Sequence, residues 1–119
     1  MQAKLWTVDA MPWEVVNPSF ERRLVHGDQT MLAFLHLHRG CQVPRHSHHN
    51  EQASYVIEGR LRFLVGAEDE EVVVGPGQVL FLPSHLPHSA EALEDTRGID
   101  VFTPPRQDWL DGTDDYLRR

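Results

Sequence analysis

The sequence has little of what marks several common classes of protein. Its single cysteine, Cys41, excludes an intrachain disulfide, and no apolar run reaches the length of a signal peptide or a transmembrane helix. Only eleven Lys and Arg residues face eighteen Asp and Glu residues, and the net charge is -7. Because a nucleic-acid backbone attracts positive charge, this balance disfavours such a partner. We expect a cytoplasmic protein that binds neither membranes nor nucleic acids.

Long helical periods are missing as well. Short apolar alternations broken by Gly, Pro, Asn and Asp run along the chain, which is typical of β-strands. A chain of 119 residues can bury one core, whereas two halves would each have too little apolar surface. The pattern therefore predicts a single all-β domain, a sandwich or a barrel. The expected strands are residues 20–25, 31–38, 54–57, 60–65, 71–74, 79–82 and 98–102.

The two ends of the chain are less regular. The N-terminal strands and arm, residues 1–29, include an apolar stretch with little charge, made of Trp6, Met11, Trp13, Val15 and Val16. Because this stretch is too long to stay exposed on a small monomer, we predict that it packs against the second subunit of a homodimer. The acidic C-terminal tail, residues 104–119, has a few apolar anchors. We expect it to be irregular or to form a short helix, and to strap the outside of the sandwich.

The histidines are the most informative residues. His46 and His48 are two positions apart, and a strand places residues i and i+2 on the same face. Two imidazoles can therefore converge on one point, as metal ligands do. Gln52 and His88 follow further along the chain. The segments that carry these four residues are punctuated by Gly40, Gly59, Gly77 and Pro83.

This arrangement resembles the two motifs of the cupin superfamily, the first running from Gly40 to Gly59 and the second from Gly77 to His88. The resemblance implies a jelly-roll barrel whose core covers about residues 30–103. It also implies one divalent transition metal per chain, either Ni, Fe, Mn, Zn or Cu, since the ligand types do not select among these. The ligands implied are His46, His48, Gln52 and His88.

Gln52 stands where cupins usually have Glu, and Glu51 is its neighbour. Because a shift of one residue in a strand reverses the face, the two side chains cannot both point at the metal. We predict that Gln52 is the ligand, with Glu51 as the alternative. Three imidazoles and an amide leave the charge of a divalent cation uncompensated, so the centre should attract an anionic or enolic oxygen.

His36 and His38 have the same spacing as His46 and His48, but they lack the downstream Gln, Gly and His framework. Residues 35–38 alternate apolar and polar side chains, as a half-buried strand does. We therefore predict that His36 and His38 face the solvent.

A further group of residues lies after the second motif. Asp100 and Phe102 share one strand face, so an inward orientation would place a carboxylate and an aromatic ring beside the metal. Two prolines, residues 104–105, end the strand because they remove backbone donors. Arg106, just beyond, can fold over the mouth of the barrel and bind a carboxylate through two parallel hydrogen bonds.

The first motif, His-x-His-x-x-Glu-Gln, and the segment Asp-Val-Phe-x-Pro-Pro-Arg at residues 100–106 together resemble the KdgF family, small cupins of pectin and alginate breakdown. That resemblance implies that the protein converts 4,5-unsaturated uronates, which are small anionic sugar acids, to their linear keto form. Asp100 would be the catalytic acid and base, and Phe102 and Arg106 would bind the substrate. The chain departs from the family at His49 and Asn50, where Pro and His are frequent.

Two other functions stay open. A metal held by three imidazoles can also activate dioxygen, as in cupin dioxygenases that act on small organic acids or phenolics. A cupin without catalytic activity would use the metal only to anchor a sugar or a small acid. Structural roles also compete with the catalytic ones: Asp100 pairing with Arg97, Arg106 pairing with Asp108 on the surface, and Phe102 filling the core.

Overall fold

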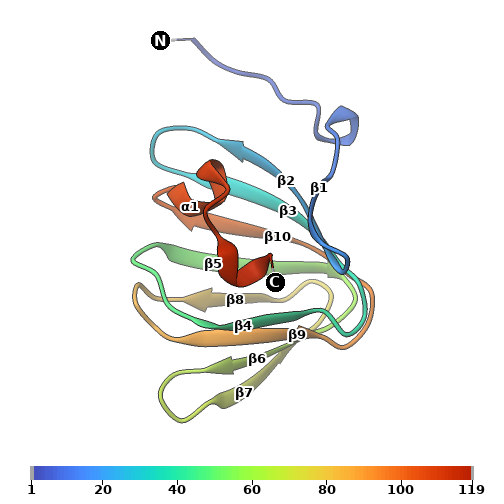
Figure 1. The fold of residues 1–119 in the computed structure, drawn as a ribbon, viewed down its shortest axis with the longest axis vertical. Coiled ribbons are helices and arrows are strands. Elements are labelled where there is room, and N and C mark those ends of the chain that lie inside the picture. Colours follow the sequence, from blue (N-terminus) through green and yellow to red (C-terminus); the bar gives the residue numbers. More distant parts are fainter. Residues whose placement is uncertain (1, 119) are drawn as a thin grey trace.

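The computed structural model describes residues 2–118, which fold into two antiparallel sheets packed against each other (Figure 1). In spatial order, the six-stranded sheet contains β1 (Glu14–Asn17), β2 (Phe20–His26), β3 (Met31–Leu37), β10 (Thr96–Thr103), β5 (Glu51–Glu58) and β8 (Val79–Leu82). The four-stranded sheet contains β4 (Gln42–His46), β9 (His88–Ala92), β6 (Leu61–Val65) and β7 (Glu70–Val74). The predicted all-β sandwich is confirmed.

Alternating burial along the strands explains why these residues form sheets. In β3, four alternate side chains are buried in the core: Met31, Ala33, Leu35 and Leu37. The residues between them lie on the outer face of the sheet and are half-buried. Every strand expected from this alternation overlaps an observed strand.

The strand ranges expected from alternation did not include β1, β4 or β9. Their sequences lack a clear period of two, because Pro44 interrupts β4 and small residues fill much of β9. Pairing with neighbouring strands holds them in place instead. This matters for the site, since β4 and β9 carry two of the candidate metal ligands.

The C-terminal tail contains α1 (Gln107–Asp111) and the 3-10 turn η2 (Asp115–Leu117), so the expected short helix is present. The tail does not merely strap the outside, however. Trp109 is buried, with its ring 5.1 Å from that of Phe102 and 6.1 Å from that of Phe20. The tail therefore contributes an indole to the core between the sheets.

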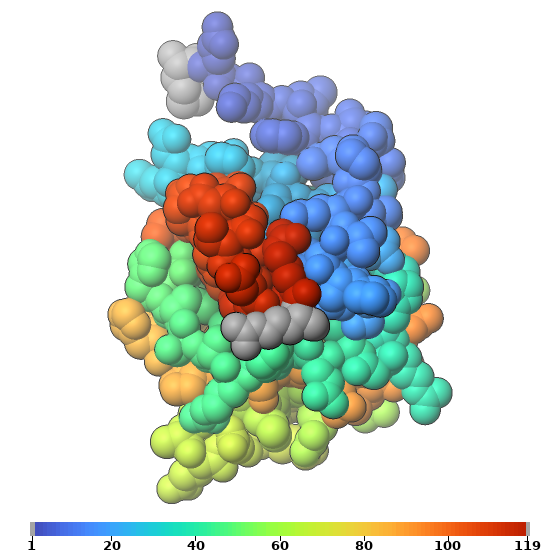
Figure 2. Space-filling view, in the orientation of Figure 1, coloured from blue at the N-terminus to red at the C-terminus, as the bar shows by residue number. Residues whose placement is uncertain are grey.

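Ion pairs fasten this tail to the N-terminal strands, against which it lies in Figure 2. The buried guanidinium of Arg22 donates to Asp114 at 2.6 Å and to Glu14 at 2.8 Å. Arg118 binds the same two carboxylates. Burial raises the pKa of Asp114, but the hydrogen bonds from Arg118 and Arg22 outweigh it and hold the pKa below its ordinary value. The network keeps Trp109 in position, since Arg22 also lies 4.5 Å from its ring centre.

The N-terminal stretch packs partly against its own chain. Val16 belongs to the core, and the ring of Trp13 lies 4.0 Å from the guanidinium of Arg23. Only the first part of the arm runs away from the sheets in Figure 1, where Leu5 and Trp6 are exposed. Trp13 and Val16 thus pack against their own chain, and contact of this stretch with a second subunit stays a prediction. Within residues 2–118, no helix has the length and apolar character needed to cross a membrane.

Candidate metal and substrate site

Three histidines converge at one end of the barrel. His46 ends β4 and His88 begins β9, and the two residues pair across the sheet. Because that pairing ends there, His48 lies in the connection to β5 and not on the strand that the spacing suggested. The ring centres are 4.3 Å apart for His46 and His88, 5.2 Å for His48 and His88, and 5.5 Å for His46 and His48. One nitrogen of each ring lies within 4.8 Å of the others.

Backbone carbonyls orient the three rings. The Nδ1 atoms of His46, His48 and His88 lie 2.7 Å, 3.1 Å and 2.9 Å from the carbonyl oxygens of Pro44, Asn50 and Leu86. A neutral imidazole that donates its Nδ1 hydrogen to a carbonyl keeps the Nε2 lone pair for a metal. The buried His88 Nε2 has no hydrogen-bond partner among residues 2–118, which fits this use.

The charge state of the rings also fits metal binding. Burial lowers the pKa of His46 and of His48 from 6.5 to about 4, and the positive charge of Arg106 acts in the same direction. Burial lowers the pKa of His88 as well. The three imidazoles are therefore neutral at pH 7, as metal ligands must be.

Gln52 completes this set, while Glu51 points away. The Gln52 side chain is buried in the cavity, and its Oε1 atom lies 3.1 Å from Nε2 of His48. Glu51 is exposed on the outer face of β5. These positions agree with the period-2 argument, and the role of Gln52 as a ligand stays a prediction. The four side chains suit a divalent transition metal with a largely nitrogen ligand set.

The amide of Gln52 also explains the departure from the usual Glu. Its nitrogen donates to the hydroxyl of Ser54 at 2.9 Å and to the carboxylate of Asp100 at 3.3 Å. Register places these groups together, because Asp100 pairs with Ser54 and Phe102 pairs with Gln52 across β10 and β5. A carboxylate at position 52 would face Asp100 at similar range and repel it.

Asp100 lies inside the barrel beside the histidines. Its carboxyl group is buried, and burial raises its pKa from 3.8 to about 6, although the Ser54 hydroxyl and the charge of Arg106 oppose the rise. The proposed structural pair with Arg97 does not form, since Arg97 points outward and binds Glu58 at 3.1 Å. A buried carboxyl group with a pKa near neutrality is suited to accept and return a proton.

The side chain of Arg106 lines the cavity, but two of its three nitrogens already donate hydrogen bonds within the protein. Its Nε and Nη2 atoms donate to both oxygens of Asp108 at 3.0 Å and 2.9 Å, and Nη2 also donates to the Tyr116 hydroxyl at 2.7 Å. The alternative pairing with Asp108 is therefore real, although Arg106 itself is buried and not on the surface. Its Nη1 atom is buried and has no hydrogen-bond partner among the described residues. Arg106 can offer a ligand one donor and its charge, not the two parallel hydrogen bonds expected.

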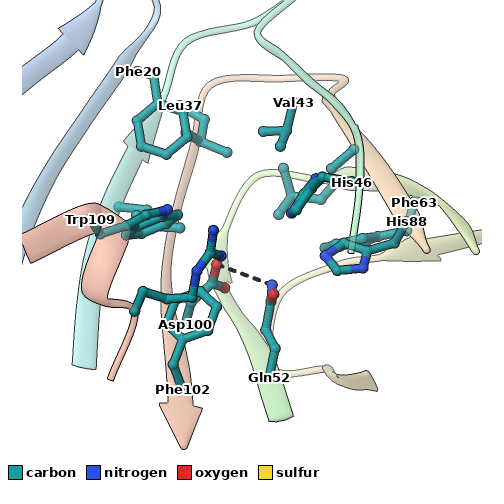
Figure 3. A pocket seen from close by; sticks show the side chains of 14 residues that line it. Phe20, Leu37, Val43, His46, Gln52, Phe63, His88, Asp100, Phe102 and Trp109 are labelled. Carbon is teal, nitrogen blue, oxygen red and sulfur yellow. Dashed lines mark hydrogen bonds between the residues drawn. The ribbon is translucent and has the colours of Figure 1, made fainter. Parts of the chain in front are cut away.

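One cavity, shown in Figure 3, is lined by six of these residues: His46, Gln52, His88, Asp100, Phe102 and Arg106. His48 lines the neighbouring hollow. The deep part of the cavity is apolar, with Phe20 and Leu37 near Trp109, while Asp100 and Gln52 are joined by a hydrogen bond at its polar part. A second hollow outside, beside the tail, shares His46 and Arg106 with the cavity. The two shared side chains therefore lie between the cavity and the outer hollow.

Sequence reasoning missed the part of the site that comes from the tail. The Tyr116 ring packs against His46, with 4.9 Å between ring centres, and its hydroxyl holds Arg106. Trp109 lines the cavity and lies 5.0 Å from the guanidinium of Arg106. In the sequence, only the apolar residues of this acidic tail pointed to such a role. They indicated that part of the tail is buried, but not which residues it contacts.

Comparison with known proteins agrees with this description. The family model of the cupin domain matches residues 33–102. The chain belongs to the cupin family. Its structure superimposes on that of KdgF from Halomonas sp. with a TM-score of 0.82 and 30% identity, covering 90% of this chain and 100% of that one. An RmlC-like cupin from Shewanella frigidimarina has a TM-score of 0.83 at 24% identity, covers 91% of this chain and 96% of its own, and supports the fold alone.

Curated relatives point to another member of the family. The 3-hydroxyanthranilate 3,4-dioxygenase of Rattus norvegicus is 29% identical over 106 residues, or 85% of this cupin, and the Homo sapiens protein matches to the same extent. This chain spans only 36% of the length of these dioxygenases. The similarity covers the cupin domain and leaves most of the relatives' length unmatched.

Proposed function

We propose that this cupin binds one divalent transition metal and promotes the opening of 4,5-unsaturated uronates to their linear keto form. The observation that carries the proposal is the buried Asp100, with a pKa raised to about 6, hydrogen-bonded to Gln52 beside three convergent histidines. The similarity to KdgF over the whole length of that protein supports it. The metal would be held by His46, His48, Gln52 and His88.

The proposed reaction is an isomerisation that needs one proton to move. Asp100, as the carboxylate, accepts the proton of the anomeric hydroxyl while the bond between the anomeric carbon and the ring oxygen breaks. The ring oxygen keeps that electron pair and becomes an enolate, and the anomeric carbon becomes an aldehyde. Asp100 then returns the proton to the alkene carbon, and the enolate becomes a ketone. Atoms balance, and Asp100 ends as it began.

Other side chains position the substrate in this scheme. The free Nη1 atom of Arg106 donates to the sugar carboxylate, and the faces of Phe102 and Trp109 pack on the sugar ring. A bound divalent metal supplies Lewis-acid polarisation of the sugar oxygens. Positioned proton transfer accelerates a reaction by about a hundred- to ten-thousand-fold, which suffices because this ring opening also proceeds unaided.

The test follows the absorbance of the conjugated alkene in freshly generated 4,5-unsaturated galacturonate. Metal-loaded protein should accelerate its decay over a sample without protein, and Asp100→Asn should lose most of the acceleration at unchanged metal content. Glu51→Gln is the matched control, since Glu51 lies on the outer face of the strand that carries Gln52. Decay at the unaided rate would contradict the proposal. Retained uronate binding without turnover would instead identify a binding module.

A second candidate is a metal-dependent dioxygenase, favoured by the similarity to the 3-hydroxyanthranilate dioxygenases. Because the four proposed ligands are neutral, a bound divalent cation would keep its full charge and attract a phenolic or carboxylate oxygen. Oxygen consumption by the Fe(II)-loaded protein with 3-hydroxyanthranilate tests this candidate. Full activity on uronates with a redox-inactive metal such as Zn²⁺ would exclude it.

We also propose that the protein forms a homodimer through the outer face of β10, β5 and β8. This face carries four exposed apolar side chains, from Tyr55, Ile57, Val79 and Phe81. It can meet a second copy in spite of the net charge of -7, because the centre of the face has no charged side chain. Light scattering of the wild type and of Phe81→Lys tests the proposal, with a dimer expected for the first and a monomer for the second. A monomeric wild type would disprove it.

A further inference from the structure

A second cluster of metal-ligand side chains lies on the opposite side of the six-stranded sheet. Glu21 of β2 pairs with His36 of β3, and His38 follows two positions after His36. All three side chains point to the outer face, away from the barrel. The ring centres of the two histidines are 4.3 Å apart.

The donor atoms of this cluster are already close together. Nε2 of His38 lies 2.7 Å from Oε1 of Glu21, and Nδ1 of His36 lies 3.8 Å from the same oxygen. All three donors fall within 4.8 Å of one another. Two ligands of a tetrahedral zinc ion lie roughly 3.4 Å apart, given zinc–nitrogen and zinc–oxygen distances near 2.1 Å. The observed separations lie on either side of that value, so small side-chain rotations suffice.

The surroundings keep the cluster in place but leave it open. The side chains are 20% exposed for His36, 40% for His38 and 21% for Glu21. The ring of Trp13 lies 6.1 Å from that of His36 and covers one side of the cluster. The neighbouring Arg97 is neutralised by Glu58, which removes most of its repulsion toward a cation. Solvent can supply the fourth ligand.

We propose that Glu21, His36 and His38 form a second transition-metal site, on the outer face of the sheet. Its two imidazoles and one carboxylate suit Zn²⁺, Cu²⁺ or Ni²⁺. The carboxylate compensates one of the two positive charges, and a bound ion ties β2 to β3. The site is separate from the barrel and does not depend on the proposed uronate chemistry.

Counting zinc ions on the intact protein tests the site. Metal-free protein is titrated with Zn²⁺ against a chromophoric chelator, and two ions should bind per chain. His38→Gln should bind one, because glutamine can still donate to Glu21 but offers no imidazole nitrogen. His26→Gln is the matched control, since His26 is an exposed histidine on the same sheet and should leave the count at two.

Two further measurements separate a built site from loose binding to a surface histidine. Glu21→Gln should weaken the outer ion by at least about tenfold, because loss of even an indirect partner of a metal costs that much. Co²⁺ bound to His88→Gln, in which the inner set is broken, should still give the absorption bands of a protein-bound tetrahedral ion. A zinc count that is no lower in the double substitution of His36 and His38 by Gln than in the wild type would overturn the proposal, whether or not the barrel site also binds an ion.

Discussion

The inner and outer histidine pairs share one sequence spacing and have opposite surroundings. His46 and His48 point into the barrel, where carbonyls hold their Nδ1 atoms and burial keeps them neutral. His36 and His38 lie on the outer face, with a carboxylate between them. The comparison shows that the same i, i+2 spacing occurs in a pair directed into the barrel and in a pair on the outer face, although only the outer pair follows the direction of a strand. The face decides whether an amide or a carboxylate completes the set.

Charge is the chemical difference between the two clusters. The inner set of three imidazoles and Gln52 contributes no charge, so a divalent cation there keeps its attraction for an anionic substrate. Glu21 supplies a negative charge to the outer set. We therefore expect the inner cluster to serve binding and catalysis, and the outer one to hold an ion without a cavity for substrate.

The largest effect should come from removing the indole that closes the inner site. Trp109→Ala empties a buried position between Phe102 and Phe20 and should cost about 3–5 kcal/mol of unfolding free energy. Trp13→Ala, beside the outer cluster, should cost about 1–2 kcal/mol because that ring is only half-buried. Urea unfolding of both variants measures the two costs, and equal values would contradict the asymmetry between the sites.

Gln52→Glu would give the inner cluster the carboxylate that the outer cluster has. Metal affinity should rise, because the new charge compensates the cation. Uronate turnover should fall by about ten- to a hundredfold, since Asp100 loses a charge-assisted hydrogen bond and meets a like charge. Steady-state kinetics and a chelator titration measure both changes. Unchanged turnover would show that the neutrality of the ligand set is not required.

Acid should destabilise the metal-free protein through the inner histidines. The pKa values of His46 and His48 are lowered from 6.5 to about 4, so in that interval the unfolded chain binds protons that the folded protein does not. Asp100 has the opposite sign, because its pKa is raised from 3.8 to about 6 and the folded state takes up the proton there. The Tm should therefore fall from pH 6.5 toward pH 4, and fall more steeply in Asp100→Asn. Parallel Tm curves for the two proteins would argue against the burial of Asp100.

The smallest effect is expected at Arg97, which shares β10 with Asp100 but faces outward. Its pair with Glu58 is exposed, and exposed ion pairs contribute at most about 1 kcal/mol. Arg97→Gln should therefore change the unfolding free energy by less than that and leave the uronate rate unaltered. A loss of rate comparable to that of Asp100→Asn would mean that the two faces of β10 are coupled.

Local sequence patterns predicted much of the fold and the face of each candidate residue. The alternation in β10 placed Asp100 and Phe102 on one face, which the structure shows to be the inner one, and the shift of one residue separated Gln52 from Glu51. Alternation did not give the bounds of β4 or β9, whose residues do not alternate, and only the histidine spacing indicated a strand at His46. That spacing also placed His48 on a strand, although the ladder to β9 ends at His46.

Contacts between segments far apart in the chain could not be predicted from such patterns. Tyr116 meets Arg106 because the tail folds back over the barrel, and Glu21 meets His38 because β2 pairs with β3. Neither pair has a spacing that a strand or helix period predicts. The sequence suggested the pairing of Arg106 with Asp108 as a surface ion pair. In the structure the pair forms, but the guanidinium of Arg106 is buried.

By itself, the sequence determined the direction of each side chain on the alternating strands, because that direction follows from backbone geometry over a few neighbouring residues. It also supplied the residue types needed for a metal and a proton carrier. Only the tertiary structure decided which residues of the tail reach the candidate site, how far the pKa of Asp100 rises and which nitrogen of Arg106 has no partner among the described residues. Desolvation and the sharing of hydrogen bonds depend on segments far apart in the chain, and these meet only in the folded protein.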